Sequence, residues 1–266
     1  MKSNCILSVI SVMILSVGNL FAYDNTYAVI VAINDYQNFG RYSGDLEYTI
    51  SDARSFNSFL QSSKGGSVPA TNIYYLTDSK ATKSNIIYYA KKLFARAKTN
   101  DRVIFYFSGH GSSGCFVPYD ATINGGNLLY FSEVKEVFRA AKCNTKLLFA
   151  DACYSGSMKK NASKQLQEKM NAASNKDSNM NIAVMMSCAN NETSLESGEL
   201  NHGLFTYYLI QGLGGSANSD GNKYVTIQEL YYYVNQKVRA KANSMGHTQT
   251  PVLFGNFDLR LIVAKV

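Results

Sequence analysis

Short apolar runs and amphipathic segments alternate along the chain. Mostly apolar runs rich in β-branched and aromatic residues predict buried strands at residues 26–34, 73–76, 102–107, 146–150 and 181–188. Between these runs, apolar residues recur at helical spacing and predict helices at residues 45–60, 83–97 and 133–141. Strands that alternate with helices predict an α/β fold with a central, mostly parallel sheet flanked by helices.

The C-terminal part continues this alternation. A helix is predicted at residues 204–213, and it closes at two glycines. Thr226 and Glu229 form the pattern of a capping box, which opens a second helix that runs to about residue 242. The apolar residues between positions 254 and 263 predict one last strand.

A lysine-rich linker interrupts the pattern at residues 157–180. Its composition is rich in Lys, Asn and Ser and poor in β-branched residues, which is typical of a mobile segment or a weak helix. The linker separates residues 23–156 from residues 181–266. Because both parts supply strands, we expect a single domain over residues 23–266 rather than two domains.

The N-terminus has the pattern of a signal peptide at residues 1–22. Lys2 precedes a mostly apolar, uncharged run at residues 5–17, and Ala22 ends a short cleavage-site sequence. We therefore expect export to the periplasm or the extracellular space. The alternatives are an uncleaved anchor or a buried first helix, although the run is short for a membrane span. No later segment has the pattern of a transmembrane helix, so no stable membrane span is expected after cleavage.

The chain is basic, with a formal net charge of +7. The Lys and Arg residues are spread over the predicted helices and form no stripe interleaved with aromatic residues. Solvated helical faces explain this pattern, so no nucleic-acid partner is expected. Binding of the basic surface to anionic polymers stays as an alternative that rests on the charge alone.

Cysteine and histidine usage argues against a disulfide framework and a zinc cluster. The five cysteines are irregularly spaced without a CxxC pair, and the chain has three histidines. No metal and no cofactor are therefore predicted. Cys143 and Cys188 are interpreted as buried small hydrophobic residues. His202 and His247 fall in predicted polar loops, where no catalytic role is assigned to them.

His110 and Cys153 follow two predicted strands, at residues 102–107 and 146–150. Because the carboxyl ends of parallel strands meet at one edge of a sheet, both side chains can converge on one substrate. A histidine that removes the thiol proton produces a thiolate that attacks a carbonyl carbon. The backbone N–H groups of Gly111 and Cys153 are candidates for the oxyanion hole. These residues predict a cysteine endopeptidase.

Four motifs give the chain a resemblance to the caspase-like cysteine peptidases, and within them to the metacaspases and their bacterial relatives. In chain order they are ISDA at 50–53, FSGHG at 107–111, DACYSG at 151–156 and GLFT at 203–206. The resemblance extends from about residue 27 to the C-terminus. It implies the caspase-hemoglobinase fold, with one antiparallel edge strand, and it implies His110 as general base and Cys153 as nucleophile.

Asp151 stands where caspase signatures have Gln, two residues before the cysteine. A carboxylate in the primary pocket repels acidic side chains and attracts basic ones. The resemblance to metacaspases implies that Asp52 and Ser108 line the same pocket, whereas Thr49 replaces a cysteine of that pocket. The structural alternatives are a solvated helix charge for Asp52 and a satisfied turn carboxylate for Asp151. We predict cleavage of protein or peptide substrates after Arg or Lys.

Lysines in the linker are candidate cleavage sites for the enzyme itself, because mobile loops are where proteolytic cuts concentrate. We predict a zymogen that processes itself after Lys159, Lys160 or a later lysine, and the alternative is a linker that stays intact in an active single chain.

Calcium activates several metacaspases, and their acidic insertion after the His motif is absent here. Asp120 alone offers too few oxygen ligands for a calcium ion. Calcium is therefore left unsupported.

Two rival interpretations remain open at the level of sequence. One is a caspase-like peptidase with a different primary preference, such as a small or acidic residue. The other is a binding or scaffold protein that keeps the fold without catalysis. A monomer is expected, and the alternative is that the last strand pairs with a second copy of the chain instead of staying an edge.

Overall fold

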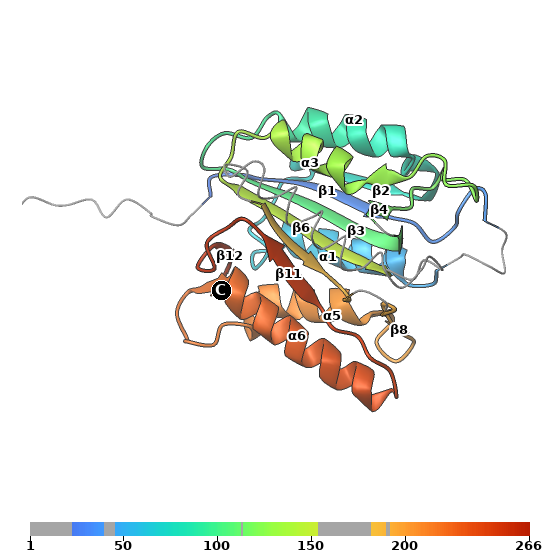
Figure 1. Cartoon of the computed structure of the whole chain (residues 1–266). Coiled ribbons are helices and arrows are strands. Elements are labelled where there is room, and N and C mark those ends of the chain that lie inside the picture. The colour runs from blue at the N-terminus through green and yellow to red at the C-terminus, as the bar shows by residue number, and fades with distance from the viewer. Residues whose placement is uncertain (1–22, 40–45, 113, 154–181, 190–191) are drawn as a thin grey trace, which may run out of the picture.

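The central sheet follows the strand order β11-β7-β6-β3-β1-β2 (Figure 1). The structure is a computed structural model, and it describes residues 23–39, 46–112, 114–153, 182–189 and 192–266. The parallel strands are β1 (Thr26–Ala32), β2 (Ile73–Thr77), β3 (Arg102–Ser112), β6 (Thr145–Cys153) and β7 (Ile182–Met186). β11 (Val252–Gly255) pairs antiparallel with β7 at one edge. The predicted α/β fold with a mostly parallel sheet and one antiparallel edge strand is confirmed.

Helices cover both faces of the sheet (Figure 1). On one face lie α2 (Lys83–Phe94) and α3 (Phe131–Arg139), and on the other lie α1 (Thr49–Gln61), α5 (Leu204–Gln211) and α6 (Ile227–Ser244). Short 3₁₀ segments at Ala70–Asn72 and Asp78–Lys80 flank β2, and a π-type segment at Gly212–Ser216 follows α5.

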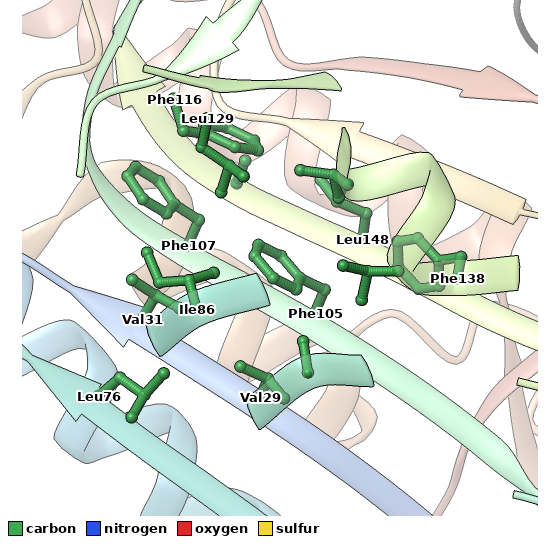
Figure 2. Close-up of a cluster of buried hydrophobic side chains, with 14 of the residues drawn as sticks. Val29, Val31, Leu76, Ile86, Phe105, Phe107, Phe116, Leu129, Phe138 and Leu148 are labelled. Atoms are coloured by element: carbon green, nitrogen blue, oxygen red, sulfur yellow. The ribbon is translucent and has the colours of Figure 1, made fainter. Parts of the chain in front are cut away.

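The alternation of side chains along the strands explains why the sheet needs both layers. Every residue of β1 is buried. Val29 and Val31 pack toward α2 and α3, whereas Ile30 packs toward the other helices. Figure 2 shows the first of these two cores, in which the rings of Phe107 and Phe116 stack with centroids 4.4 Å apart. Each such buried ring stabilises the fold by roughly 1.5–3 kcal/mol.

The side chain of Asn34 fixes the start of α1 just beyond β1. Its Oδ1 accepts hydrogen bonds from the backbone N–H of Ile50 at 3.2 Å and from the hydroxyl of Thr49 at 2.5 Å. The helix therefore starts at Thr49, later than the predicted residue 45, which lies outside the described residues. This contact also orients α1 so that its first turn, with Asp52, lies beside the carboxyl ends of the strands.

The prediction of one last strand at residues 254–263 is wrong. The segment contains two strands, β11 and β12 (Ile262–Lys265), and β12 pairs with β10 (Tyr224–Thr226) in a separate sheet. Gly255 ends β11 with φ of 128°, a conformation that favours glycine. A turn follows, in which the carboxylate of Asp258 accepts hydrogen bonds from the backbone and side chain of Arg260.

Two short strands carry the residues that lead into α5. β8 (Glu196–Ser197) and β9 (His202–Gly203) pair antiparallel, and β9 packs on α1. In the same region, the carboxylate of Glu196 accepts the backbone N–H groups of Glu47 and Tyr48 before the first turn of α1.

The predicted signal peptide at residues 1–22 and the whole of the predicted linker at 157–180 lie outside the described residues. Within the described ranges, no helix combines the length and the apolar character needed to cross a membrane.

Candidate active site

His110 and Cys153 are register partners on the neighbouring strands β3 and β6. One step earlier Gly109 is paired with Ala152, and two steps earlier Ser108 is paired with Asp151. Neighbouring strands lie about 4.8 Å apart, so the backbones of these partners are adjacent. β3 continues through the Gly-His-Gly sequence to Ser112, beyond its predicted end at residue 107. The two motifs singled out in the sequence therefore meet at the carboxyl edge of the sheet.

Tyr36 contacts both the ring and the backbone of His110. The two rings stack with centroids 4.9 Å apart and planes inclined by 28°, and the His110 backbone N–H donates to the Tyr36 hydroxyl at 2.6 Å. A Cβ at position 109 would lie 2.8 Å from that hydroxyl. Glycine at position 109 therefore allows the close approach of Tyr36. No local pattern distinguishes Tyr36, because it follows a predicted strand without a motif of its own.

The backbone before Cys153 is held by Ser187, just beyond β7. The Ser187 hydroxyl accepts the N–H of Ala152 and donates to the carbonyl of the same residue, both at 3.2 Å. Buried Gln249 donates in turn to the Ser187 carbonyl at 3.0 Å. The C-terminal part of the chain thus fixes the strand that carries the predicted nucleophile.

Gly111 follows His110 in β3 and is the register partner of Phe116 in β4 (Cys115–Phe116). β4 also pairs with β5 (Leu129–Tyr130). The assignment of the Gly111 N–H to an oxyanion hole stays a prediction.

The three predicted pocket residues lie together at the same edge. Asp52 is 1% exposed and Asp151 is 6% exposed, so the interpretation of Asp52 as a solvated helix charge is wrong. The Asp52 carboxylate accepts the N–H of Gly203 at 3.1 Å and the hydroxyl of Ser108 at 3.4 Å. Thr49 is buried and donates to Asn34, so its hydroxyl does not serve the pocket.

Asp151 is satisfied by hydrogen bonds from two segments of the C-terminal part. Its Oδ2 accepts the backbone N–H of Thr206 at 3.1 Å and the hydroxyl of Thr206 at 2.8 Å. Its Oδ1 accepts the hydroxyl of Ser194, which also accepts a hydrogen bond from Gln249. The hydrogen bonds of Asp151 agree with its alternative interpretation as a carboxylate with satisfied hydrogen bonds, although Asp151 lies in a strand rather than in a turn.

Gly203 lies between the two carboxylates. A Cβ at this position would stand 2.4 Å from Oδ2 of Asp151 and 2.9 Å from Oδ2 of Asp52. Real Cβ atoms do not approach oxygen atoms so closely, so only glycine fits between these two acids. The GLFT motif contributes this glycine as well as Thr206.

Burial of two carboxyl groups side by side disfavours their ionised forms. Burial, and then the charge of Asp151, raise the pKa of Asp52 well above its ordinary value, and the Gly203 N–H and Ser108 hydroxyl oppose that rise. Burial also raises the pKa of Asp151, against the hydrogen bonds of Ser194 and Thr206. A cation placed beside Asp52 would relieve this repulsion, which is the electrostatic property expected of a pocket for a basic side chain.

His202 contacts Asp52 directly. Its Nδ1 lies 2.8 Å from Oδ1 of Asp52, and its Nε2 lies 3.4 Å from the hydroxyl of Ser55. The placement of His202 in a polar loop is therefore wrong: it belongs to β9 and contacts Asp52. The contact joins positions 150 residues apart, so no local pattern could have predicted it.

The other described cysteines are poor nucleophiles. Cys115, Cys143 and Cys188 are free and buried, which confirms the interpretation of Cys143 and Cys188. Burial raises the pKa of the Cys115 thiol to about 11, and it also raises the pKa of the Cys143 thiol.

Within the part of the chain that the structure describes, no group of three His, Cys, Asp or Glu residues is arranged to hold a metal ion. Asp120 accepts the backbone N–H of Lys83 at 2.8 Å and so supports the start of α2. The candidate processing sites Lys159 and Lys160 lie outside the described residues.

Comparisons with known proteins agree with this geometry. The family model of the caspase domain matches residues 25–260. A probable protease of a Desulfuromonadales bacterium is 23% identical over an alignment of 258 positions, which covers 85% of this chain and 31% of that relative, so the chain spans about a third of its length.

Two solved structures share the fold. Caspase-1 of Spodoptera frugiperda has a TM-score of 0.62 at 14% identity, and the superposition covers 89% of this chain and 89% of the other. A protein of Geobacter sulfurreducens has a TM-score of 0.58 at 16% identity, over 89% of this chain and 97% of the other. The extent of the family match, together with this fold, shows that the chain belongs to the caspase-domain family of peptidases.

Proposed function

We propose that this protein is a cysteine endopeptidase in which His110 is the general base and Cys153 is the nucleophile. The observation that carries the proposal is the register pairing of these two residues on adjacent strands. Tyr36 on one side and Ser187 on the other hold the backbones of the two motifs in place.

The reaction follows from the chemistry of the two side chains. His110 removes the thiol proton of Cys153, and the thiolate attacks the carbonyl carbon of the scissile bond. The N–H groups of Gly111 and Cys153 donate to the oxyanion that forms. The protonated imidazole then gives its proton to the leaving amine. Water, deprotonated by His110, attacks the thioester and releases the second product with the free thiol.

We further propose cleavage after Arg or Lys. Ser108 and Asp151 each lie two residues before a proposed catalytic position, and Asp52 of α1 contacts Ser108. The two buried carboxylates have no Lys or Arg partner among the described residues. An acidic substrate side chain would add a further carboxyl group to a site that already disfavours ionisation of its two acids, whereas a guanidinium or ammonium group would stabilise their ionised forms.

Export through the signal peptide at residues 1–22 and self-processing after Lys159 or Lys160 belong to the same proposal. The composition of both segments supports them. Under this proposal the protein acts as a monomer, without a metal cofactor, on protein substrates in the periplasm or outside the cell.

Covalent labelling tests the nucleophile and the pocket together. The wild-type protein is incubated with two chloromethyl ketones that differ only in their last residue, Arg or Asp, and the intact mass is measured. We expect one adduct from the Arg reagent on Cys153, no adduct in Cys153→Ala, and unchanged labelling in Cys143→Ala. Labelling by the Asp reagent alone would refute the pocket, and labelling that survives in Cys153→Ala would refute the nucleophile.

A further inference from the structure

His202 contacts Asp52, whose hydrogen-bond partners differ from those of Asp151. A carboxylate offers about four positions to hydrogen-bond donors. Asp151 receives three donors from Thr206 and Ser194. Two of those donors belong to buried Thr206, so they form part of the framework.

Asp52 is held differently. Its partners are the backbone N–H of Gly203, the hydroxyl of buried Ser108 and the imidazole of His202. The Gly203 N–H belongs to the backbone of β9, and the Ser108 side chain is buried in β3. The imidazole is a side chain at the margin, with 18% of its surface exposed compared with 2% for the side chain of Asp52. His202 is therefore the partner that an incoming group can replace.

We propose that His202 determines access to the acidic pocket: its imidazole occupies the place on Asp52 that the basic side chain of a substrate takes, and it leaves when that side chain enters. This inference rests on the proposed preference for Arg or Lys. In the tautomer that carries its proton on Nδ1, the exchange conserves hydrogen bonds, because one N–H donor on Oδ1 of Asp52 is replaced by another. An arginine gains in addition, because its planar guanidinium donates two parallel hydrogen bonds and carries a charge.

The charge of the imidazole sets how firmly it holds Asp52. The titratable groups around His202 are Asp52 of α1, Asp151 of β6, Glu196 of β8 and Tyr207 of α5, whose ring centroid is 6.2 Å from that of the imidazole. Burial lowers the pKa of His202, and the charge of Asp151 opposes this effect. The imidazole is therefore neutral near pH 7 and releases Asp52 more readily than an imidazolium would. Acidification protonates the imidazole and strengthens its hold on an ionised Asp52. It also protonates Asp52 in wild type and His202 variants alike, so the contribution of the imidazole is the difference between them.

Steady-state kinetics of an Arg peptide test this proposal in wild type, His202→Ala, His202→Asn and the control His247→Ala. His247 is exposed and lies outside the pocket. We expect KM to fall about 3- to 10-fold in His202→Ala, with kcat changed less than about 2-fold, because the competing imidazole is gone while the reacting groups are intact.

His202→Asn keeps an N–H donor near the position of Nδ1 but cannot be protonated. Its KM should match wild type near pH 7 and rise less than wild type at acid pH.

The opposite results would overturn the proposal. A higher KM in His202→Ala, similar to that of Asp52→Asn, would mean that His202 positions Asp52 instead of competing with substrate. An unchanged KM in His202→Ala would mean that the substrate side chain does not take the position of the imidazole beside Asp52. Thermal unfolding of each variant shows whether a kinetic change reflects loss of the fold.

A binding measurement separates failure of this inference from failure of the proposed function. If wild type cleaves no peptide, the proposed function fails, and the imidazole resonances of His202 are then followed by NMR in Cys153→Ala during addition of N-acetyl-arginine amide. Displacement from Asp52 predicts a shift of the His202 resonances that saturates, with His247 unchanged. Resonances of His202 that do not move would refute its displacement.

Discussion

The ring of Tyr36 stacks on the ring of His110, and the hydroxyl of Tyr36 accepts the backbone N–H of the same residue. One side chain therefore fixes both the backbone and the ring plane of the proposed general base. A side chain at position 109 would collide with this hydroxyl, so the first glycine of the Gly-His-Gly sequence and Tyr36 act as a unit.

Tyr36→Phe should reduce kcat more than it reduces stability. The substitution keeps the stacked ring but removes the acceptor of the His110 N–H, a hydrogen bond that contributes on the order of 1 kcal/mol. We expect kcat for an Arg peptide to fall about 5-fold, with KM nearly unchanged. Urea unfolding should show a loss of about 1 kcal/mol. A kcat equal to that of wild type would show that the hydroxyl does not position His110.

Gly203→Ala should abolish binding of basic substrates. The added methyl group would stand between Asp52 and Asp151 and force at least one carboxylate to move. Overpacking of this kind costs roughly 1–3 kcal/mol in unfolding free energy. Kinetics with an Arg peptide and urea unfolding measure both effects.

Gly214→Ala is the matched control for that substitution, because a Cβ there would meet nothing closer than the Phe59 ring at 4.0 Å. It should keep the activity and the stability of wild type. Equal behaviour of the two variants would contradict the packing described for Gly203.

Asp52→Asn should lower activity toward basic substrates and raise stability at neutral pH. The pKa of Asp52 in the folded protein lies well above its ordinary value, because of burial and the neighbouring Asp151. Ionisation of Asp52 therefore destabilises the fold. The protonated form of Asp52 contributes to the free energy of unfolding. This contribution is fully present below the pKa that Asp52 has in the unfolded chain, and it is lost as the pH rises through the pKa of Asp52 in the folded protein.

The difference in unfolding free energy between Asp52→Asn and wild type should therefore grow in favour of the variant from about pH 4 to pH 8. Urea denaturation at several pH values measures it. A difference in unfolding free energy that stays constant with pH would contradict a raised pKa of Asp52 in the folded protein.

Self-processing should depend on Cys153 and on basic residues of the linker. We expect mass spectrometry of the purified protein to find cuts after Lys159 or Lys160 in wild type and none in Cys153→Ala. Lys159→Gln combined with Lys160→Gln should move the cut to a later lysine or prevent it. The same fragments in wild type and Cys153→Ala would assign the cuts to another protease.

The buried strands were predictable because burial leaves a strong local pattern. β1, β6 and β7 are apolar on both faces, so their runs stand out from the helices between them. The end of β3 was not predictable in this way, since glycine normally weakens a strand. It continues past Gly109 because β6 pairs with it as far as His110 and β4 pairs with Gly111 and Ser112.

The contacts of the pocket depend on tertiary structure and were only partly predictable. Asp52 and Asp151 were found through their place in known motifs, but nothing local indicates that Gly203 separates them. His202 and Tyr36 act through partners 150 and 74 residues away. Such pairings become visible only when the sheet brings the four motifs to one edge.

Hydrolysis of peptides that end in Arg, Lys, Asp or Ala, by wild type and by Cys153→Ala, tests the central claim most directly. Cleavage after Arg and Lys alone, which is lost in Cys153→Ala, is the predicted result. Cysteine-dependent cleavage after Asp would keep the nucleophile and contradict the acidic pocket. Cleavage after Arg that persists in Cys153→Ala would contradict the assignment of Cys153 as the nucleophile.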